Sequence, residues 1–325
     1  MPITKEAYGT MPDGRAVDAY TLDNGILQAK ILTYGATLDA LFTPDRDGTQ
    51  GNVLLTFGSL EERREKSAYQ GETVGPYANR IGGAKFTLNG KEHRVTANID
   101  GEICLHSAGE YSHTVWDVVS CDDTSITLAY TSPDGTEGFP GTVKATAYYA
   151  LDGATLVIDY RAVSDQDTIL NLTNHAYFNF VNAGDILSHE LQINADRYLP
   201  MSEALLPTGE IAPVAGTVFD FRALRPIRQA GYDHNFCLNE GCDATACNAA
   251  AIVYEPTTGR TMELRTNQPG VQFYCGNMLR PPLTGFCLET QIWPDCTNHQ
   301  WPGNDYILRA GDEYFSHTAL TFSAK

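Results

Sequence analysis

The segment 171–180, with the sequence NLTNHAYFNF, gives the strongest single indication of fold and function. Side chains of a β-strand alternate between its two faces, so an extended chain here sorts into two sets. One set is polar and uncharged, and the other is apolar except for Asn174. The sets are Asn171, Thr173, His175, Tyr177 and Asn179, and Leu172, Asn174, Ala176, Phe178 and Phe180. The polar row suits a neutral, hydroxyl-rich partner such as a carbohydrate, but a half-buried strand with one hydrogen-bonded histidine explains it equally well.

Length and composition limit the classes of protein that the chain can represent. It has 325 residues, of which 42% are hydrophobic, and a formal net charge of −18. A large hydrophobic core is therefore expected, and all-β folds of more than two hundred residues often form one domain. Nucleic-acid binding is not expected, because phosphate contacts need clustered Lys and Arg. The same acidity argues weakly against a phosphorylated substrate.

The cysteines and the amino-terminal segment indicate the compartment. The first residues, MPITKEAYGTMPDGR, lack a basic region followed by an apolar run, so no signal peptide is expected. No stretch of eighteen successive apolar residues predicts a membrane span. Eight cysteines are scattered along the chain, which is typical of a reducing compartment, and we expect a cytoplasmic protein. Cys237, Cys242 and Cys247 are five residues apart, unlike zinc-site cysteines, and are interpreted as structural or incidental.

Strand-like runs separated by turn residues follow one another along the chain. The best helix candidate is 59–69, where Ser59 and Glu62 are spaced for a capping box. Asn89-Gly90 predicts a hairpin between strands 85–88 and 91–95. No repeat or composition break divides the sequence, so the pattern predicts one all-β domain, 1–325, a large antiparallel β-sandwich. The other predicted strands are 26–33, 37–42, 52–57, 115–120, 125–130, 142–150, 155–163, 168–180, 189–195, 236–238, 250–255, 261–265, 271–274, 286–293, 306–309 and 316–322.

A second segment, 285–295 with the sequence GFCLETQIWPD, places a carboxylate in a predicted buried strand. Alternation puts Cys287, Glu289, Gln291 and Trp293 on one face. A buried carboxylate is costly unless it is paired or functional. With Trp293 as an aromatic platform, the face is similar to a sugar site. An arginine that pairs with Glu289 across the sheet is the structural alternative.

Six separated segments, taken together and in this order, resemble the aldose 1-epimerase family, the galactose mutarotases. They are YANRI at 77–81, LH at 105–106, NLTNHAYFN at 171–179, YDHNF at 232–236, PGVQFYCGN at 269–277 and GFCLETQ at 285–291. The resemblance implies a β-sandwich with an open sugar cleft. It also implies an isomerase that interconverts the α and β anomers of free hexoses such as galactose and glucose without metal or cofactor.

The same resemblance assigns roles within the site. Glu289 would be the general base, His175 the general acid, and His106 would stabilise the ring oxygen. The remaining expected site residues bind sugar hydroxyls or line the cleft: Asn79, Arg80, Asp233, Gln272, Tyr177 and Trp293. Anomer exchange fits this set, because a base must take the proton of the C1 hydroxyl while an acid protonates O5. The expected partner is a small neutral sugar, bound by a monomer or a homodimer.

Three departures from the family pattern bear on the preferred sugar. Ser107 and Ala108 follow His106 where glycines are common, Pro76 replaces a frequent arginine, and Trp293 stands where phenylalanine is frequent. Two other functions stay open on the sequence. An epimerase of another sugar or of a sugar phosphate is one, although a phosphate site should carry more cations than Arg80. A non-catalytic sugar-binding protein is the other, although binding alone needs no matched acid and base.

Overall fold

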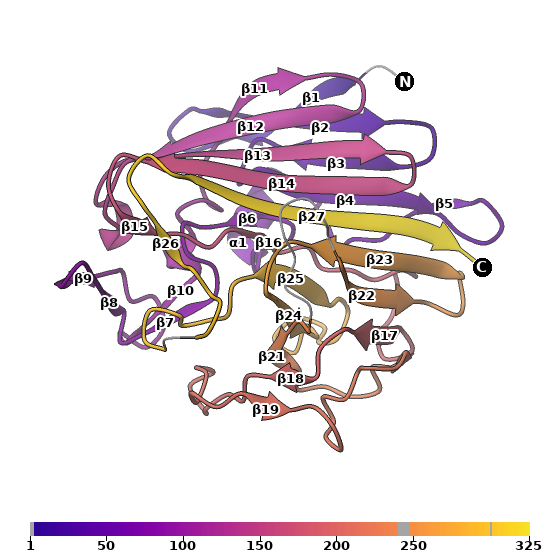
Figure 1. The fold of residues 1–325 in the computed structure, drawn as a ribbon. Coiled ribbons are helices and arrows are strands. Elements are labelled where there is room, and N and C mark those ends of the chain that lie inside the picture. Colours follow the sequence, from indigo (N-terminus) through magenta and orange to yellow (C-terminus); the bar gives the residue numbers. More distant parts are fainter. Residues whose placement is uncertain (1–2, 240–247, 300) are drawn as a thin grey trace.

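The computed structural model describes residues 3–239, 248–299 and 301–325, and antiparallel strands dominate it (Figure 1). The largest layer is a nine-stranded sheet, ordered β11-β12-β13-β14-β27-β23-β22-β17-β20. Its strands, in that order, are Asp117–Cys121, Ser125–Ser132, Val143–Asp152, Thr155–Ser164, Glu313–Ala324, Arg260–Thr266, Asn248–Tyr254, Glu190–Ile193 and Arg225–Pro226. Alternate residues are buried along β13 and β14, as expected for a sheet with one face on the core.

A five-stranded sheet from the amino-terminal part of the chain forms the second layer, behind β12–β14 in Figure 1. It consists of β1 (Thr4–Thr10), β2 (Ala16–Asp23), β3 (Gln28–Leu32), β4 (Thr37–Pro44) and β5 (Gln50–Asn52). Leu22 and Ile31 of this layer share one core cluster with Leu128 and Ile158 of the nine-stranded sheet. The predicted antiparallel β-sandwich is therefore confirmed. The sequence interpretation missed β1 and β2; β1 is a largely exposed edge strand with little apolar pattern.

A third sheet, ordered β19-β18-β21-β24-β25, lies below the long strands in Figure 1. Its strands are Ala212–Pro213, Arg197–Tyr198, Asp233–Cys237, Gly270–Tyr274 and Cys287–Gln291. One face of β25 packs on the nine-stranded sheet: Leu288 joins the main core, and the hydroxyl oxygens of Thr290 and Thr318 lie 2.6 Å apart. The opposite face of β25 carries Cys287, Glu289 and Gln291, as the alternation predicted.

Short elements connect the layers. Four strand pairs are β6 (Thr73–Val74) with β16 (Thr173–Asn174), β7 (Arg80–Gly82) with β10 (Ile103–Leu105), β8 (Lys85–Leu88) with β9 (Lys91–Arg94), and β15 (Thr168–Ile169) with β26 (Ile307–Leu308). The helices are α1 (Leu60–Lys66) and the 3-10 turns η1 (His106–Gly109) and η2 (Thr136–Gly138). Asn89 and Gly90 have positive φ, which confirms the predicted hairpin. Ser59 caps α1, but the helix ends at Lys66, before the predicted end at Tyr69.

The segment 171–180 is not the continuous strand that its alternation predicted. Its backbone N–H groups donate to carbonyls in different parts of the chain. Asn171 donates to the Pro76 carbonyl, His175 to the Glu72 carbonyl and Phe178 to the Phe286 carbonyl. Because no single neighbour runs alongside it, only the pair at β16 forms a ladder. The predicted apolar side chains are nevertheless in the main core, among them Leu172, Phe178 and Phe180.

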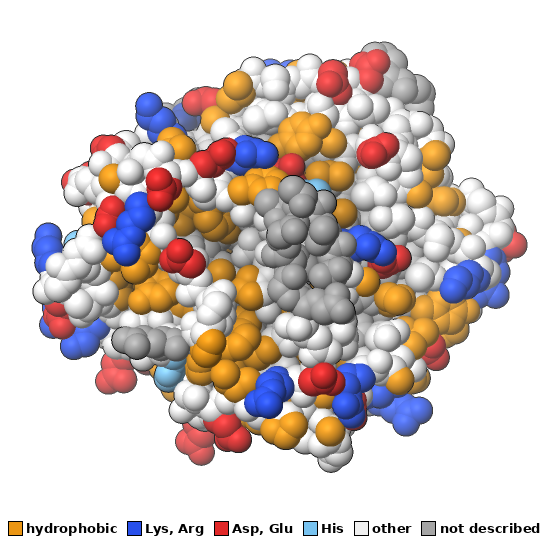
Figure 2. Space-filling view, viewed as in Figure 1, with side chains coloured by type: hydrophobic (Ala, Val, Ile, Leu, Met, Phe, Trp, Pro, Cys, Tyr) orange, Lys and Arg blue, Asp and Glu red, His pale blue; other side chains and the backbone are white. Residues whose placement is uncertain are grey.

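The distribution of surface charge, the lengths of the helices and the state of the cysteines complete the description of the fold. On the face shown in Figure 2, Lys and Arg side chains stand among Asp and Glu side chains. Within the described residues, no helix combines the length and the apolarity that a membrane crossing requires. Six cysteines are free thiols, five of them buried and Cys121 exposed. Cys242 and Cys247 lie outside the described residues.

Candidate active site

The predicted site residues converge on a cavity of about 120 Å³ between the third sheet and the strand pairs that precede it. Seven of the nine predicted residues line it, and they come from five separated parts of the sequence. The lining consists of Ala68, Tyr69, Asn79, Arg80, Leu105, His106, His175, Tyr177, Asp233, Tyr274, Met278 and Glu289.

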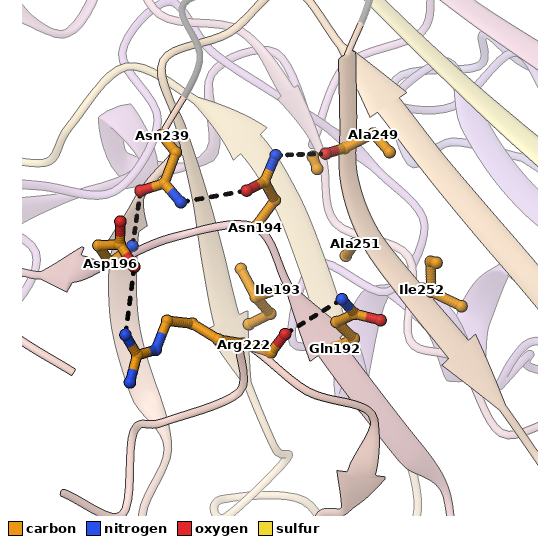
Figure 3. Close-up of a pocket in the computed structure, with 10 residues that line it drawn as sticks. Gln192, Ile193, Asn194, Asp196, Arg222, Asn239, Ala249, Ala251 and Ile252 are labelled. Carbon is orange, nitrogen blue, oxygen red and sulfur yellow. Dashed lines mark hydrogen bonds and ion pairs between the residues drawn. The ribbon is translucent and has the colours of Figure 1, made fainter. Parts of the chain in front are cut away.

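A larger cavity, of about 370 Å³, lies between β17 and β22 and contains no predicted site residue (Figure 3). Its polar groups bond to one another. Asn194 donates to the Ala249 carbonyl and accepts from Asn239, while Arg222 lies 3.5 Å from Asp196. Among the described residues that line this cavity, these polar groups are already paired, and none of the lining residues is a histidine or a glutamate.

The pairing of β7 with β10 positions His106 beside Asn79. The backbone N–H of Asn79 donates to Nδ1 of His106 at 3.1 Å, and the N–H of His106 returns to the Asn79 carbonyl at 3.0 Å. Both residues have positive φ, which aims their side chains into the cavity. Burial, together with the charge of Arg80, holds the pKa of His106 well below its usual range. His106 is therefore neutral, and because Nδ1 accepts a hydrogen bond, its proton is on Nε2.

His175 is held by its backbone and lies close to two side chains of β25. Its backbone N–H donates to the backbone carbonyl of Glu72, and its own carbonyl accepts the backbone N–H of Gly71. On the ring, Nδ1 lies 3.4 Å from Sγ of Cys287, and Nε2 lies 3.7 Å from Oε1 of Glu289. Burial lowers the pKa of His175 to about 4. The imidazole is thus neutral in the free site.

Glu289 is a buried carboxyl group without an arginine partner of its own. It is 2% exposed, and its Oε2 has no hydrogen-bond partner among the described residues. Burial and the charge of Asp233 raise its pKa well above the usual range, while Arg80 acts in the opposite direction. Arg80 pairs instead with Asp233, with NH1 3.7 Å from Oδ2. The structural alternative of a Glu289–arginine pair therefore does not hold.

The structure corrects the positions predicted for Gln272 and Trp293. Gln272 lies behind the cavity wall, fully buried, where its Nε2 donates to Oδ1 of Asp233 at 2.7 Å. Trp293 is partly buried and packs against the second core cluster, with its ring centroid 5.8 Å from that of Trp301, and its indole N–H donates to the Pro269 carbonyl. The alternation misplaced Trp293 because β25 ends at Gln291 and the chain turns before position 293.

Two asparagines of the predicted polar row also serve the backbone instead of the cavity. Oδ1 of Asn171 accepts the N–H of Ile292, and Oδ1 of Asn179 accepts two backbone N–H groups, those of Val181 and Asn182. Of that row, His175 and Tyr177 line the cavity.

Two aromatic residues that the sequence interpretation did not select take the place expected for Trp293. The ring of Tyr69, in a left-handed turn with φ of 65°, lies 4.7 Å from that of His106 and 6.0 Å from that of His175. No sequence pattern indicated this turn, because the expected helix continued through it. Tyr274 could have been found, since alternation places it on the face of Gln272.

Three of the lining residues have the composition of a metal site. One ligand atom from each of His106, His175 and Glu289 lies within 4.8 Å of the others. However, the hydrogen bond from Asn79 requires the proton of neutral His106 to be on Nε2, so that nitrogen has no lone pair for a metal. His175 and Glu289 alone supply fewer protein ligands than the three usual in catalytic zinc sites. The donor set therefore fits proton transfer better than metal binding.

Comparison with known proteins gives a consistent result. The sequence model of the family described as "Aldose 1-epimerase" matches residues 18–321. Galactose mutarotase of Rattus norvegicus is 41% identical over 345 residues, which cover 99% of this chain and 98% of that protein. Aldose 1-epimerase of Escherichia coli K12 is 35% identical over 340 residues, 97% of each.

The solved structures agree. That of galactose 1-epimerase from Lactobacillus acidophilus NCFM is similar with a TM-score of 0.87 at 30% identity, and covers 99% of this chain and 98% of its own. The structure of an aldose epimerase homologue from C. elegans has the same TM-score at 26% identity, and the match covers 94% of this chain and 99% of that one. Sequence similarity over nearly the whole length and a shared fold therefore lead to one conclusion. The chain belongs to the aldose 1-epimerase family.

Proposed function

We propose that the protein interconverts the α and β anomers of free aldohexoses, galactose and glucose among them, by opening and closing the sugar ring. The observation that carries this proposal is the buried pair of Glu289 and His175, 3.7 Å apart in a small polar cavity. A matched acid and base have no purpose in a protein that only binds a sugar. The mutarotase and epimerase names of the relatives point to the same reaction.

Ring opening transfers two protons at once. Glu289, as a carboxylate, takes the proton of the C1 hydroxyl; the C1–O1 bond becomes a carbonyl, the C1–O5 bond breaks, and imidazolium His175 delivers its Nε2 proton to O5. Glu289 is then protonated and His175 neutral. Rotation of the aldehyde about C1–C2 and the reverse transfers give the other anomer. Both arrangements hold one proton on the pair, so no net proton is taken up or released.

The environment of the pair is suited to this exchange. Burial raises the pKa of Glu289 and lowers that of His175, so the free site favours protonated Glu289 with neutral His175. This is the arrangement that accompanies the open-chain aldehyde. Ring opening therefore begins with transfer of the Glu289 proton to His175, and ring closure starts from the favoured arrangement.

The other lining residues are assigned to binding. His106 with its proton on Nε2 is suited to donate to the ring oxygen, and Asn79, Arg80 and Asp233 to bind hydroxyl groups. Gln272 orients Asp233 through the 2.7 Å hydrogen bond. Arg80 is the sole Lys or Arg among the described residues that line the cavity, which favours a neutral sugar over a sugar phosphate.

Compartment and assembly are further parts of the proposal. Six free thiols among the described residues suit a reducing cytoplasm. Assembly as a monomer or a homodimer is proposed, with all the site residues assigned here supplied by one chain.

Polarimetry tests the reaction directly. Pure protein added to freshly dissolved α-galactose or α-glucose should speed the approach to the equilibrium rotation without changing its final value. E289Q protein at the same concentration is the matched control. Binding of either sugar without any increase in the mutarotation rate would support the non-catalytic alternative.

A further inference from the structure

Cys287 is the nearest neighbour of the acid–base pair for which the proposed reaction has no role. It precedes Glu289 by two residues on β25, so both side chains point to the same face of one strand. Its Sγ lies 3.4 Å from Nδ1 of His175, and Oε1 of Glu289 lies 3.7 Å from Nε2 of the same ring. A single strand thus supplies the neighbours of both imidazole nitrogens.

Each nitrogen of this ring must behave differently if His175 exchanges a proton with the sugar. Nε2 faces Glu289 and must alternate between an N–H and a free lone pair. Nδ1 must then keep its proton in both states, because a neutral imidazole has one N–H. From this geometry, and on the basis of the proposed function, we infer that Cys287 is a positioning residue: its sulfur accepts the Nδ1–H of His175 and reserves Nε2 for the proton exchange.

His106 provides the internal contrast. Its Nδ1 faces a backbone donor, the N–H of Asn79, and its Nε2 must therefore keep the proton. His175 faces a sulfur and holds the opposite tautomer. The two rings lie 5.2 Å apart, so one cavity contains a fixed donor and an exchanging imidazole whose Nδ1 atoms have different partners.

A thiol suits this position better than a carboxylate would. Cys287 is fully buried beside Tyr177, Tyr274 and Leu279, and burial raises the pKa of its thiol well above the usual range. It stays uncharged. A carboxylate at this place would hold His175 as an imidazolium and hinder release of its proton. A neutral, weak acceptor fixes the tautomer and leaves the ring free to lose and regain the Nε2 proton.

The test compares C287S and C287A in the full-length protein. Serine keeps an acceptor of similar size, whereas alanine removes it. We expect C287A to lower kcat about tenfold, which corresponds to the loss of about one hydrogen bond. KM should change little, because Cys287 does not line the cavity. C287S should recover most of the activity. C237A, which removes another buried thiol outside the cavity, is the matched control.

Two-bond ¹H–¹⁵N spectra of protein labelled at histidine read the tautomers independently of activity. Wild type should show the proton on Nδ1 of His175 and on Nε2 of His106, and C287A should move the His175 proton to Nε2. Wild type with the proton on Nε2 of His175, or C287A with unchanged tautomer and unchanged kcat, would overturn the inference. C287S as impaired as C287A in a folded protein would also overturn it. Wild type that lacks mutarotation would refute the proposed function instead.

Discussion

Nε2 of His175 lies 3.7 Å from Oε1 of Glu289, and both side chains are almost completely buried. His175 directly follows β16, and Glu289 lies on β25, 114 positions later in the sequence (289 minus 175). The spacing exceeds a strong hydrogen bond, so neither group immobilises the other. An oxygen of the substrate can therefore exchange protons with either residue.

Replacing the base tests half of this relationship. E289Q keeps the shape of the side chain and its hydrogen-bonding capacity but removes proton acceptance. A positioned acid or base contributes ~10²–10⁴-fold in rate, which corresponds to roughly 3–5 kcal/mol of barrier. We expect kcat to fall by that factor, measured by polarimetry, in a protein whose melting shows that it is folded.

The acid is tested in the same way by H175N. Because both groups act in one step, the double variant should be little slower than either single variant. Additive losses in the double variant would mean that the two groups do not act in one step. An E289Q protein within a few-fold of wild type would mean that the base lies elsewhere.

Activity should survive exhaustive chelation. His106, His175 and Glu289 are close enough to suggest a metal, but the Asn79 hydrogen bond keeps the His106 lone pair away from the cavity. Mutarotation rates before and after EDTA treatment and buffer exchange should agree. If EDTA abolished mutarotation and a divalent ion restored it, both this prediction and the tautomer assigned to His106 would be wrong.

Alternation within 171–180 and 285–295 predicted which face of each segment carries His175 and Glu289, and most of the adjacent core. This worked because core packing fixes which side of an extended segment is apolar, even where no regular ladder forms. Phe178 and Phe286 pack together in the core, which leaves His175 and Glu289 on the side of the cavity. Antiparallel pairing along the chain was likewise visible in the spacing of turns.

The alternation failed where the chain leaves the strand geometry. Trp293 follows the end of β25 and turns into the second core cluster, and Tyr69 reaches the cavity from a left-handed turn. Neither event leaves a periodic signal, because each depends on tertiary contacts. Arg63, for example, donates to the Gln70 carbonyl and pairs with Asp39, which holds the turn that carries Tyr69.

We therefore expect Tyr69, and not Trp293, to supply an aromatic face of the sugar site. Y69A should raise KM for the sugar about tenfold, because it removes an apolar face of the cavity. W293F should leave KM unchanged and lower the melting temperature, since it removes the hydrogen bond to Pro269 at a partly buried position. Steady-state kinetics and thermal melts of both variants test these two expectations. A raised KM in W293F with normal Y69A would restore the original assignment.

Arg80 should act through sugar binding. Its side chain lines the cavity beside Asp233, and a hydrogen bond from a charged group contributes about 1.5–3 kcal/mol. R80A should raise KM and lower kcat/KM by about 10–100-fold. R309A, which removes an exposed arginine that pairs with Asp167, is the control and should behave as wild type. Unchanged kinetics in R80A would show that Arg80 serves only the structure at the start of β7.

The pH dependence of kcat/KM should report the proton shared by Glu289 and His175. A second proton on the pair enters at His175, whose pKa is lowered by burial to about 4, so activity should persist well below the usual histidine range. The pair loses its proton at Glu289, whose pKa burial raises, so the alkaline limb should lie far above the usual range of a glutamate. Both limbs belong to the coupled pair.

The D233N variant tests the direction in which Asp233 shifts the pKa of Glu289. Asp233 raises the pKa of Glu289 through its negative charge, whereas Arg80 lowers it. Asparagine removes the negative charge, so Glu289 should lose its proton more easily and the alkaline limb should move to lower pH. KM should also rise, because a cavity residue is changed. D159N, which removes a carboxylate that bonds to His317 on the nine-stranded sheet, should leave the limb in place. An alkaline limb in D233N that stays or moves upward would mean that the titrating group is not Glu289.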